Sequence, residues 1–190
     1  MFYRHFDALI GVSNTGPLIS AFQCGQTNLL RRYFRVIHIP QSELDEFQRH
    51  NAAEEIEQLI DEGLVQVQVL TPEECRRAEE IARWIASRPS TRVKEYQHHL
   101  PEAEAMVLVE RENLDADVIL LDEQAAREVV RELGLPVAGF VAILGKACLE
   151  GLFSAEEIRT LLKVCQAAGT RYSNALIEEV YRQYGGDSDE

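Results

Sequence analysis

Short apolar runs and longer amphipathic segments alternate along the whole chain, and this alternation predicts strands and helices that follow one another. The run from Asp117 to Leu121 is the most continuous, as expected for a strand buried on both faces of a parallel sheet. Residues 65–70 alternate with a period of two, which predicts a half-buried strand at or near a sheet edge. The predicted strands cover residues 8–13, 35–39, 65–70, 117–121 and 135–138.

Residues typical of helix starts and helix ends lie at the boundaries of the amphipathic segments. Thr71, Pro72 and Glu74 form a capping-box pattern with proline in the first turn, and Gly134 is suited to close the helix before it. The segment 87–100 breaks the apolar pattern, and we expect an exposed loop there. The helices are expected at residues 14–22, 42–49, 51–62, from 71 onward, 101–112, 124–133, 140–150, 154–168 and 173–184.

This order of elements predicts an α/β fold, a three-layer α/β/α domain around a central, mainly parallel sheet. No repeat or linker interrupts it, so we expect one domain over residues 1–184. Residues 185–190 (GGDSDE) are expected to form an acidic, disordered tail.

Charge and cysteine usage narrow the function classes. The 190 residues carry a formal net charge of −13, which argues against tight, non-specific binding to nucleic acid. It leaves open an enzyme that touches nucleic acid through metal ions. The four cysteines show no C-x-x-C spacing, as expected for reduced thiols, and no apolar run approaches a membrane span or a signal peptide. We therefore expect a cytoplasmic protein without a membrane partner.

Acidic and amide side chains follow the predicted strands at their carboxyl ends, where parallel sheets form ligand crevices. Asn14 follows the first strand and the pair Asp122 and Glu123 follows the fourth. Glu46 and Glu102 lie on helices expected to line the same edge. A purely structural interpretation stays open for each: Asn14 and Asp122 as helix caps, Glu46 and Glu102 as solvated helix residues.

These residues lie in segments that resemble a known family. The run VSNTGPLI at residues 12–19 resembles the opening of PIN-domain proteins. Later elements agree in order: I-P followed by E-F at 39–47, E-A-E-A at 102–105, L-L-D-E with Arg127, G-L-P-V-A-G at 134–139 and Y-S-N-A-L at 172–176. The resemblance spans roughly residues 10 to 182 and is strongest to a stand-alone branch of the family.

The resemblance implies a nuclease site in which carboxylates hold Mg²⁺ or Mn²⁺ for hydrolysis of phosphodiester bonds, usually in RNA. Hard divalent ions prefer oxygen ligands, and they can bridge an acidic protein to an acidic polymer. Glu46, Glu102 and Asp122 are the implied catalytic residues. The implied metal ligands are Asn14, Glu46, Glu102, Asp122 and Glu123, with Glu104 as a nearby substitute.

Thr15 and Arg127 are expected to contact the substrate. The basic residues of the segment 87–100 are further candidates for this contact, namely Arg88, Arg92 and Lys94. The expected partners are RNA or another single-stranded nucleic acid, a small antitoxin-like protein and a second copy of the chain. Stand-alone relatives resemble the toxin component of toxin–antitoxin pairs.

Three positions depart from the family pattern. Asn14 stands where catalytic members mostly carry aspartate, Pro101 replaces a glycine, and Phe140 replaces a small hydroxyl residue. The neutral Asn14 removes one negative charge from the implied metal site. The alternative interpretation is therefore a catalytically degenerate PIN-like interaction module without nuclease activity.

Overall fold

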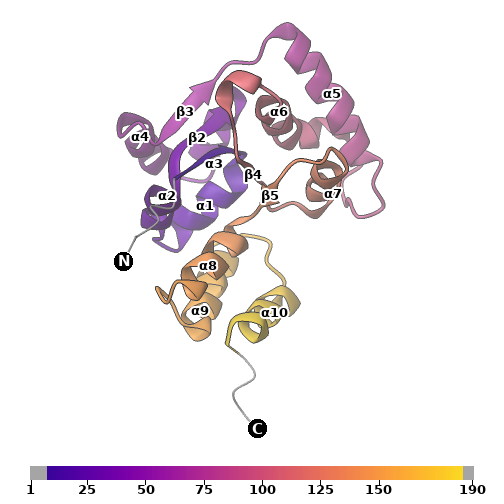
Figure 1. Ribbon diagram of the computed structural model, residues 1–190. Coiled ribbons are helices and arrows are strands. Elements are labelled where there is room, and N and C mark those ends of the chain that lie inside the picture. The colour runs from indigo at the N-terminus through magenta and orange to yellow at the C-terminus, as the bar shows by residue number, and fades with distance from the viewer. Residues whose placement is uncertain (1–7, 186–190) are drawn as a thin grey trace.

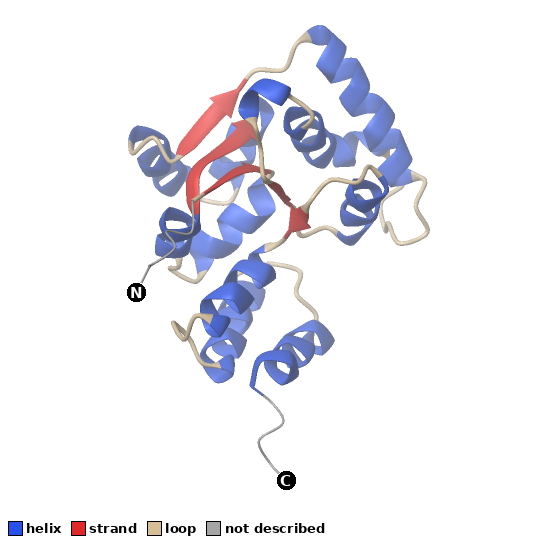
Figure 2. Cartoon of the chain, viewed as in Figure 1, coloured by secondary structure: helices blue, strands red, loops and turns tan. Residues whose placement is uncertain are grey.

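The computed structural model describes residues 8–185, and its centre is a five-stranded sheet in the order β3-β2-β1-β4-β5 (Figures 1 and 2). Every pairing in it is parallel. The strand from the alternating segment lies at an edge, as predicted. The strands are β1 (Leu9–Ser13), β2 (Phe34–Pro40), β3 (Val65–Gln68), β4 (Val118–Leu120) and β5 (Val137–Ala138).

Helices connect consecutive strands and complete the chain. Those that precede β4 are α1 (Thr15–Gln23), α2 (Thr27–Tyr33), α3 (Leu44–Arg49), α4 (Ala53–Asp61), α5 (Pro72–Ala86) and α6 (Leu100–Val109). Those that follow it are α7 (Gln124–Glu132), α8 (Phe140–Leu149), α9 (Ala155–Ala167) and α10 (Asn174–Gly185). Short 3₁₀ turns are η1 (Gln41–Glu43), η2 (Tyr96–His99) and η3 (Glu112–Leu114).

Two apolar clusters cover the two faces of the sheet. Leu120 packs with α1, α2, α4 and the C-terminal helices, whereas its neighbours Ile119 and Leu121 pack with α5, α6 and α7. This alternation follows from the period of two along a strand. Figure 1 shows the helices on either side of the sheet, with α8, α9 and α10 grouped beyond β5. The predicted three-layer α/β/α architecture is confirmed.

Two segments differ from the sequence-based expectation. Helix α2 was not predicted, and its N-cap residue Gln26 makes no side-chain capping bond that would mark its start. Most of the segment 87–100 is exposed or half-buried, as expected, but Thr91 and His99 are buried. Their polar atoms are satisfied locally, since His99 Nε2 lies 3.2 Å from Thr91 Oγ1 and 2.9 Å from the carbonyl oxygen of Val93. A polar run can be buried when its members bond one another.

The C-terminal boundary also shifts slightly. Helix α10 runs through Gly185, the first residue of the predicted tail, and residues 186–190 lie outside the described part of the chain. Among the described helices, none combines the length and apolar character needed to cross a bilayer.

Candidate metal centre

The candidate residues lie at the carboxyl edge of the sheet, where strands end and helices begin (Figure 1). Because β1 lies between β2 and β4, the ends of these three strands are adjacent. The crossovers change direction between β1 and β4, and open parallel sheets form their ligand crevice at such a point. Asn14 follows β1 and Asp122 follows β4, so the two predicted residues flank it.

Asn14 occupies the N-cap position of α1, but its side chain makes no capping bond. Its amide nitrogen Nδ2 instead donates to Glu102 Oε1 at 3.3 Å. Its side-chain oxygen Oδ1 is buried and has no hydrogen-bond partner. The capping interpretation of Asn14 is therefore wrong, and its side chain faces α6.

Glu102, in the first turn of α6, also has a buried oxygen without a partner, Oε2. The pKa of Glu102 is raised to about 7, chiefly by burial and also by the charges of Glu123 and Glu46, while a backbone hydrogen bond and the Asn14 amide oppose the rise. Without a cation, this carboxyl group is therefore close to half ionised at neutral pH.

Glu43 is the acidic residue that sequence reasoning missed. It ends η1, directly after β2, and is only 1% exposed. Its Oε2 accepts a hydrogen bond from the backbone N–H of Thr15 at 3.2 Å, and its Oε1 is buried without a partner. Burial raises the pKa of Glu43 well above its ordinary value, and the nearby Glu46 and Glu102 add to the shift. The signal in the sequence was its position three residues before Glu46, since residues so spaced share one side of a helical turn.

Glu46 and Glu104 border the same group. Glu46, on α3, has its Oε1 3.8 Å from Nε2 of His50, the residue that follows this helix. The charge of Glu46 raises the pKa values of Glu43 and Glu102. Glu104 accepts a hydrogen bond from Ser42, and burial raises its pKa. Both therefore contribute negative charge around Glu43.

Asp122 is held by two hydrogen bonds from elements far away in the sequence. The backbone N–H of Phe140, at the start of α8, donates to Oδ1 at 3.0 Å, and the Tyr172 hydroxyl donates to Oδ2 at 3.0 Å. The same hydroxyl lies 3.0 Å from Ser20 Oγ on α1. Burial raises the pKa of Asp122, and both hydrogen bonds and the charge of Arg127 oppose the shift.

The neighbouring Glu123 has a structural role. Its Oε2 accepts from the backbone N–H of Ala126 at 2.7 Å, so Glu123 is the N-cap of α7. The cap interpretation left open for Asp122 is therefore wrong for that residue. Glu123 nevertheless stays close enough to Glu102 to raise its pKa.

The two residues predicted to contact the substrate, Thr15 and Arg127, both make hydrogen bonds within the protein. Thr15 is buried and its backbone holds Glu43. Arg127 Nη1 donates to the carbonyl oxygen of Leu121 at 2.9 Å. A Cβ at Gly139 would overlap Asp122 Oδ1 and come within 2.8 Å of Arg127 Nη1, so only glycine fits between them.

The donor chemistry fits a hard divalent cation. In the described part of the chain, the buried side-chain oxygens without a hydrogen-bond partner are Asn14 Oδ1, Glu43 Oε1 and Glu102 Oε2. All three are of the type that Mg²⁺ and Mn²⁺ prefer. No group of three or more His, Cys, Asp or Glu side chains within residues 8–185 is already gathered closely enough to hold an ion. The residues thus supply the right ligands in an open arrangement.

This geometry defines a class of protein, namely a parallel α/β domain with acidic side chains gathered at the carboxyl edge of its sheet. Residues 10–186 match a family model described as a PIN domain, and the chain belongs to this family. The fold is thus of nuclease type, and PIN domains in general use divalent metals and bind nucleic acid. No curated protein matches the chain.

Proposed function

We propose that this protein is a cytoplasmic ribonuclease that hydrolyses phosphodiester bonds of single-stranded RNA with the help of Mg²⁺ or Mn²⁺. The observation that carries the proposal is the set of unpartnered buried oxygens on Asn14, Glu43 and Glu102, which lie after β1, in η1 and in α6. A buried polar oxygen without a partner is costly, and a cation at the crevice would satisfy these three.

The predicted ligands are Asn14, Glu46, Glu102, Asp122 and Glu123, of which Glu46, Glu102 and Asp122 are the catalytic residues. A bound divalent ion supplies charge neutralisation at the phosphate and lowers the pKa of water. Asp122 is oriented in advance by its two hydrogen bonds. Glu102 has a pKa of about 7 in the metal-free protein, so it would give up its proton at neutral pH on binding a cation.

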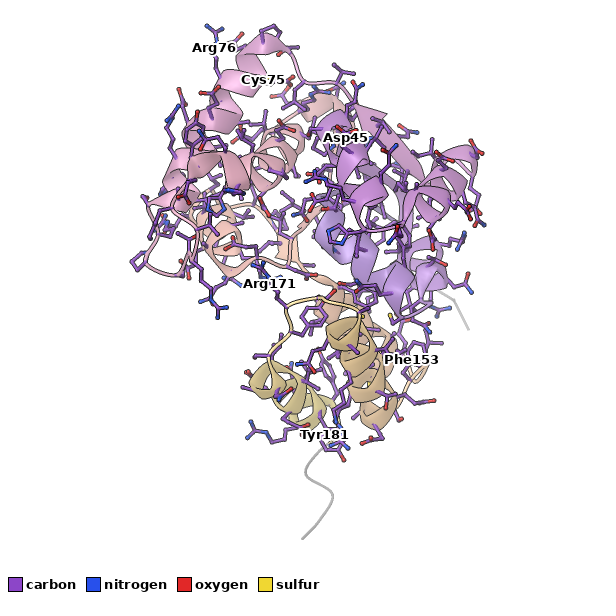
Figure 3. All side chains as sticks on the ribbon, turned by 180° about the vertical axis from the view of Figure 1, so that it is seen from behind. Asp45, Cys75, Arg76, Phe153, Arg171 and Tyr181 are labelled. Atoms are coloured by element: carbon purple, nitrogen blue, oxygen red, sulfur yellow. The ribbon has the colours of Figure 1, made fainter. Side chains whose placement is uncertain are left out.

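Contact with RNA requires local positive charge, because the chain as a whole is strongly acidic. Arg127 lies beside Asp122, and within the described residues it forms no ion pair. Arg171 is exposed and directly precedes Tyr172, which bonds Asp122. Figure 3 shows Arg171 at the junction between the sheet layers and the C-terminal helices. Both arginines are therefore placed to contact phosphate oxygens at the crevice.

Metal-dependent cleavage of a labelled single-stranded RNA tests the proposal. We expect cleavage with Mn²⁺ or Mg²⁺, none in chelator, and loss of cleavage in Glu102→Gln and Asp122→Asn. Glu57→Gln is the matched control, since Glu57 is exposed on α4 and its loss also removes one charge. Equal cleavage by all four proteins would show that the activity comes from a contaminant.

The alternative, a degenerate module that binds without cleaving, draws support from two observations. Asn14 is neutral, and no preassembled group of acids within residues 8–185 could hold an ion. This alternative predicts that RNA binds equally well with and without Mn²⁺ and stays intact. Gel-shift and cleavage assays on the same samples therefore separate the two functions.

The same proposal makes the protein a toxin component whose small antitoxin-like partner covers the acidic crevice. Expression of the wild-type chain in a bacterial host is then expected to arrest growth, and expression of Asp122→Asn is not.

We also propose that the protein forms a homo-oligomer. Large apolar side chains that are exposed on the C-terminal helices and their connection favour this, namely Leu149 and Leu152 at the α8–α9 connection and Val164 on α9. Light scattering on the wild type and on Leu149→Glu measures the oligomeric state.

A further inference from the structure

We propose that Glu43 is an additional oxygen ligand of the cation site and supplies the negative charge that the neutral Asn14 lacks. The inference rests on the proposed metal centre and extends it to a residue outside the predicted ligand set. It also accounts for how a site with asparagine after its first strand can retain a divalent ion.

The placement of Glu43 is the first support. Its Oε2 is held by the backbone N–H of Thr15, the residue that directly follows Asn14. This bond brings the carboxyl group of η1 to the N-terminus of α1, beside the position where the charge is missing. The side chain is 1% exposed, so bulk water does not solvate it.

The unpartnered oxygen is the second support. Glu43 Oε1 is buried and has no hydrogen-bond partner among the described residues. An ionised Glu43 therefore leaves this oxygen without a donor, and a proton placed on it would have no acceptor. Neither state is satisfied by the protein alone, whereas a cation would satisfy the ionised one.

The surroundings are the third support. The carboxyl groups of Glu46, Glu102 and Glu104 all act on Glu43, and within residues 8–185 Glu43 has no Lys, Arg or His ion-pair partner. The two other unpartnered oxygens, Asn14 Oδ1 and Glu102 Oε2, belong to residues hydrogen-bonded to each other. Acids packed in this way repel one another unless positive charge comes from outside the chain.

Variants that change or keep the number of negative charges at the site test the proposed role of Glu43. Moving the carboxylate from position 43 to position 14, in the double variant Asn14→Asp/Glu43→Gln, keeps the net charge of the site. Glu43→Gln alone removes one charge, and Glu57→Gln removes one charge from an exposed position on α4. Glutamine has nearly the volume of glutamate and keeps an oxygen that can accept from Thr15.

Calorimetric titration with Mn²⁺ alone reads the outcome without reference to activity. We expect Glu43→Gln to weaken Mn²⁺ binding by roughly tenfold or more, Glu57→Gln to change it less than about twofold, and the double variant to recover most of the loss. In metal-free protein, Glu43→Gln is expected to raise the melting temperature, which also verifies that the variant folds.

An unchanged Mn²⁺ dissociation constant in a folded Glu43→Gln variant would overturn the inference and leave the proposed metal centre standing. A weakened Glu43→Gln whose loss the double variant does not recover would refute the charge replacement. Absence of Mn²⁺ binding in the wild type would overturn the proposed function itself. The two failures are therefore distinguishable in one series of titrations.

Discussion

At the scale of single residues, the candidate site is a set of side chains whose hydrogen bonding is incomplete. Asn14 and Glu102 bond each other through one polar atom, and each keeps a second, buried oxygen without a partner. Most buried polar atoms in proteins are paired, so a concentration of exceptions at one sheet edge points to a missing ligand. A divalent cation is the ligand that matches oxygen donors in an acidic setting.

Restoring a carboxylate at position 14 tests this directly. Because Asn14 makes no capping bond, Asn14→Asp leaves the helix start unaffected and adds one charge to the site. We expect Mn²⁺ affinity to rise roughly tenfold, equivalent to about 1.4 kcal/mol, and the metal-free protein to become less stable. Calorimetry and thermal melting measure the two effects. Identical binding isotherms for the two proteins would remove Asn14 from the site.

The raised pKa of Glu102 makes the stability of the metal-free protein depend on pH. A carboxyl group whose pKa is higher in the folded state than its ordinary value of 4.5 stabilises the fold at low pH. That contribution is complete below pH 4.5 and is lost as the pH rises through about 7. We therefore expect wild type to lose stability relative to Glu102→Gln across this window, measured by denaturant unfolding. Parallel pH profiles for the two proteins would contradict the assignment.

At the scale of elements, the C-terminal segment reaches back to the end of β4. Tyr172, between α9 and α10, donates to Asp122 and lies beside Ser20 on α1. One hydroxyl thus joins the segment before α10 to helix α1 and to Asp122, the carboxylate that follows β4. The N-terminus of α8 adds a second tie through Phe140, which occupies a position where a small hydroxyl residue was expected. The C-terminal part of the chain therefore holds a residue of the candidate site in place.

Tyr172→Phe isolates the hydroxyl. It removes the bond to Asp122 and keeps the buried ring, so we expect a loss of about 1–2 kcal/mol in the free energy of unfolding. Because this bond lowers the pKa of Asp122, the variant is also expected to shift the acidic limb of the cleavage–pH profile upward. Tyr181→Phe, on the following helix α10 and labelled in Figure 3, is the control. A profile identical to wild type would assign Tyr172 to packing alone.

The sequence predicted the fold through features that act locally. Apolar runs mark the strands, and cap residues such as Thr71 and Ser154 mark helix starts, which the structure shows as capping boxes. Helix α2 was missed because Gln26 gives no such signal. In the segment 87–100, the burial of His99 depends on hydrogen bonds to residues whose positions the local pattern does not specify.

The site was predictable in its outline and not in its details. The ends of adjacent strands must meet, so Asn14 and Asp122 could be placed at one edge from their order in the chain. Glu43 resembles an ordinary acidic residue in a first helical turn, and only the tertiary fold buries it against Thr15. Glu123 caps α7 through Oε2, a role that the sequence did not indicate for it, and its assignment as a metal ligand stays a prediction.

At the scale of the whole molecule, the sheet topology brings acids from distant parts of an acidic chain to one edge. The net charge of −13 works against binding of RNA by the surface as a whole. A hollow of about 420 Å³ opens beside the acidic residues around Glu43 and is lined in part by Ser42 and Glu104. Asp45 and Cys75, labelled in Figure 3, are also on its wall. This hollow is lined by acidic and neutral groups and, within the described part of the chain, has no basic residue on its wall, so it does not itself attract a phosphate.

A charge reversal at the rim tests this view of substrate binding. Arg171→Glu is expected to weaken RNA binding several-fold and to reduce cleavage, while Mn²⁺ affinity stays within about twofold of wild type. Arg76→Glu, an exposed position on α5 shown in Figure 3, is the matched control. Equal losses in the two variants would mean that only net charge matters.

The most direct measurement of the central claim is a crystal structure of the protein soaked in Mn²⁺, with the ion located by its anomalous scattering. The account predicts anomalous density between Asn14, Glu43 and Glu102, at the carboxyl edge of β1, in contact with oxygens that have no partner in the metal-free chain. Density only at other surface acids, or a crevice that stays free of Mn²⁺ at saturating concentration, would contradict it.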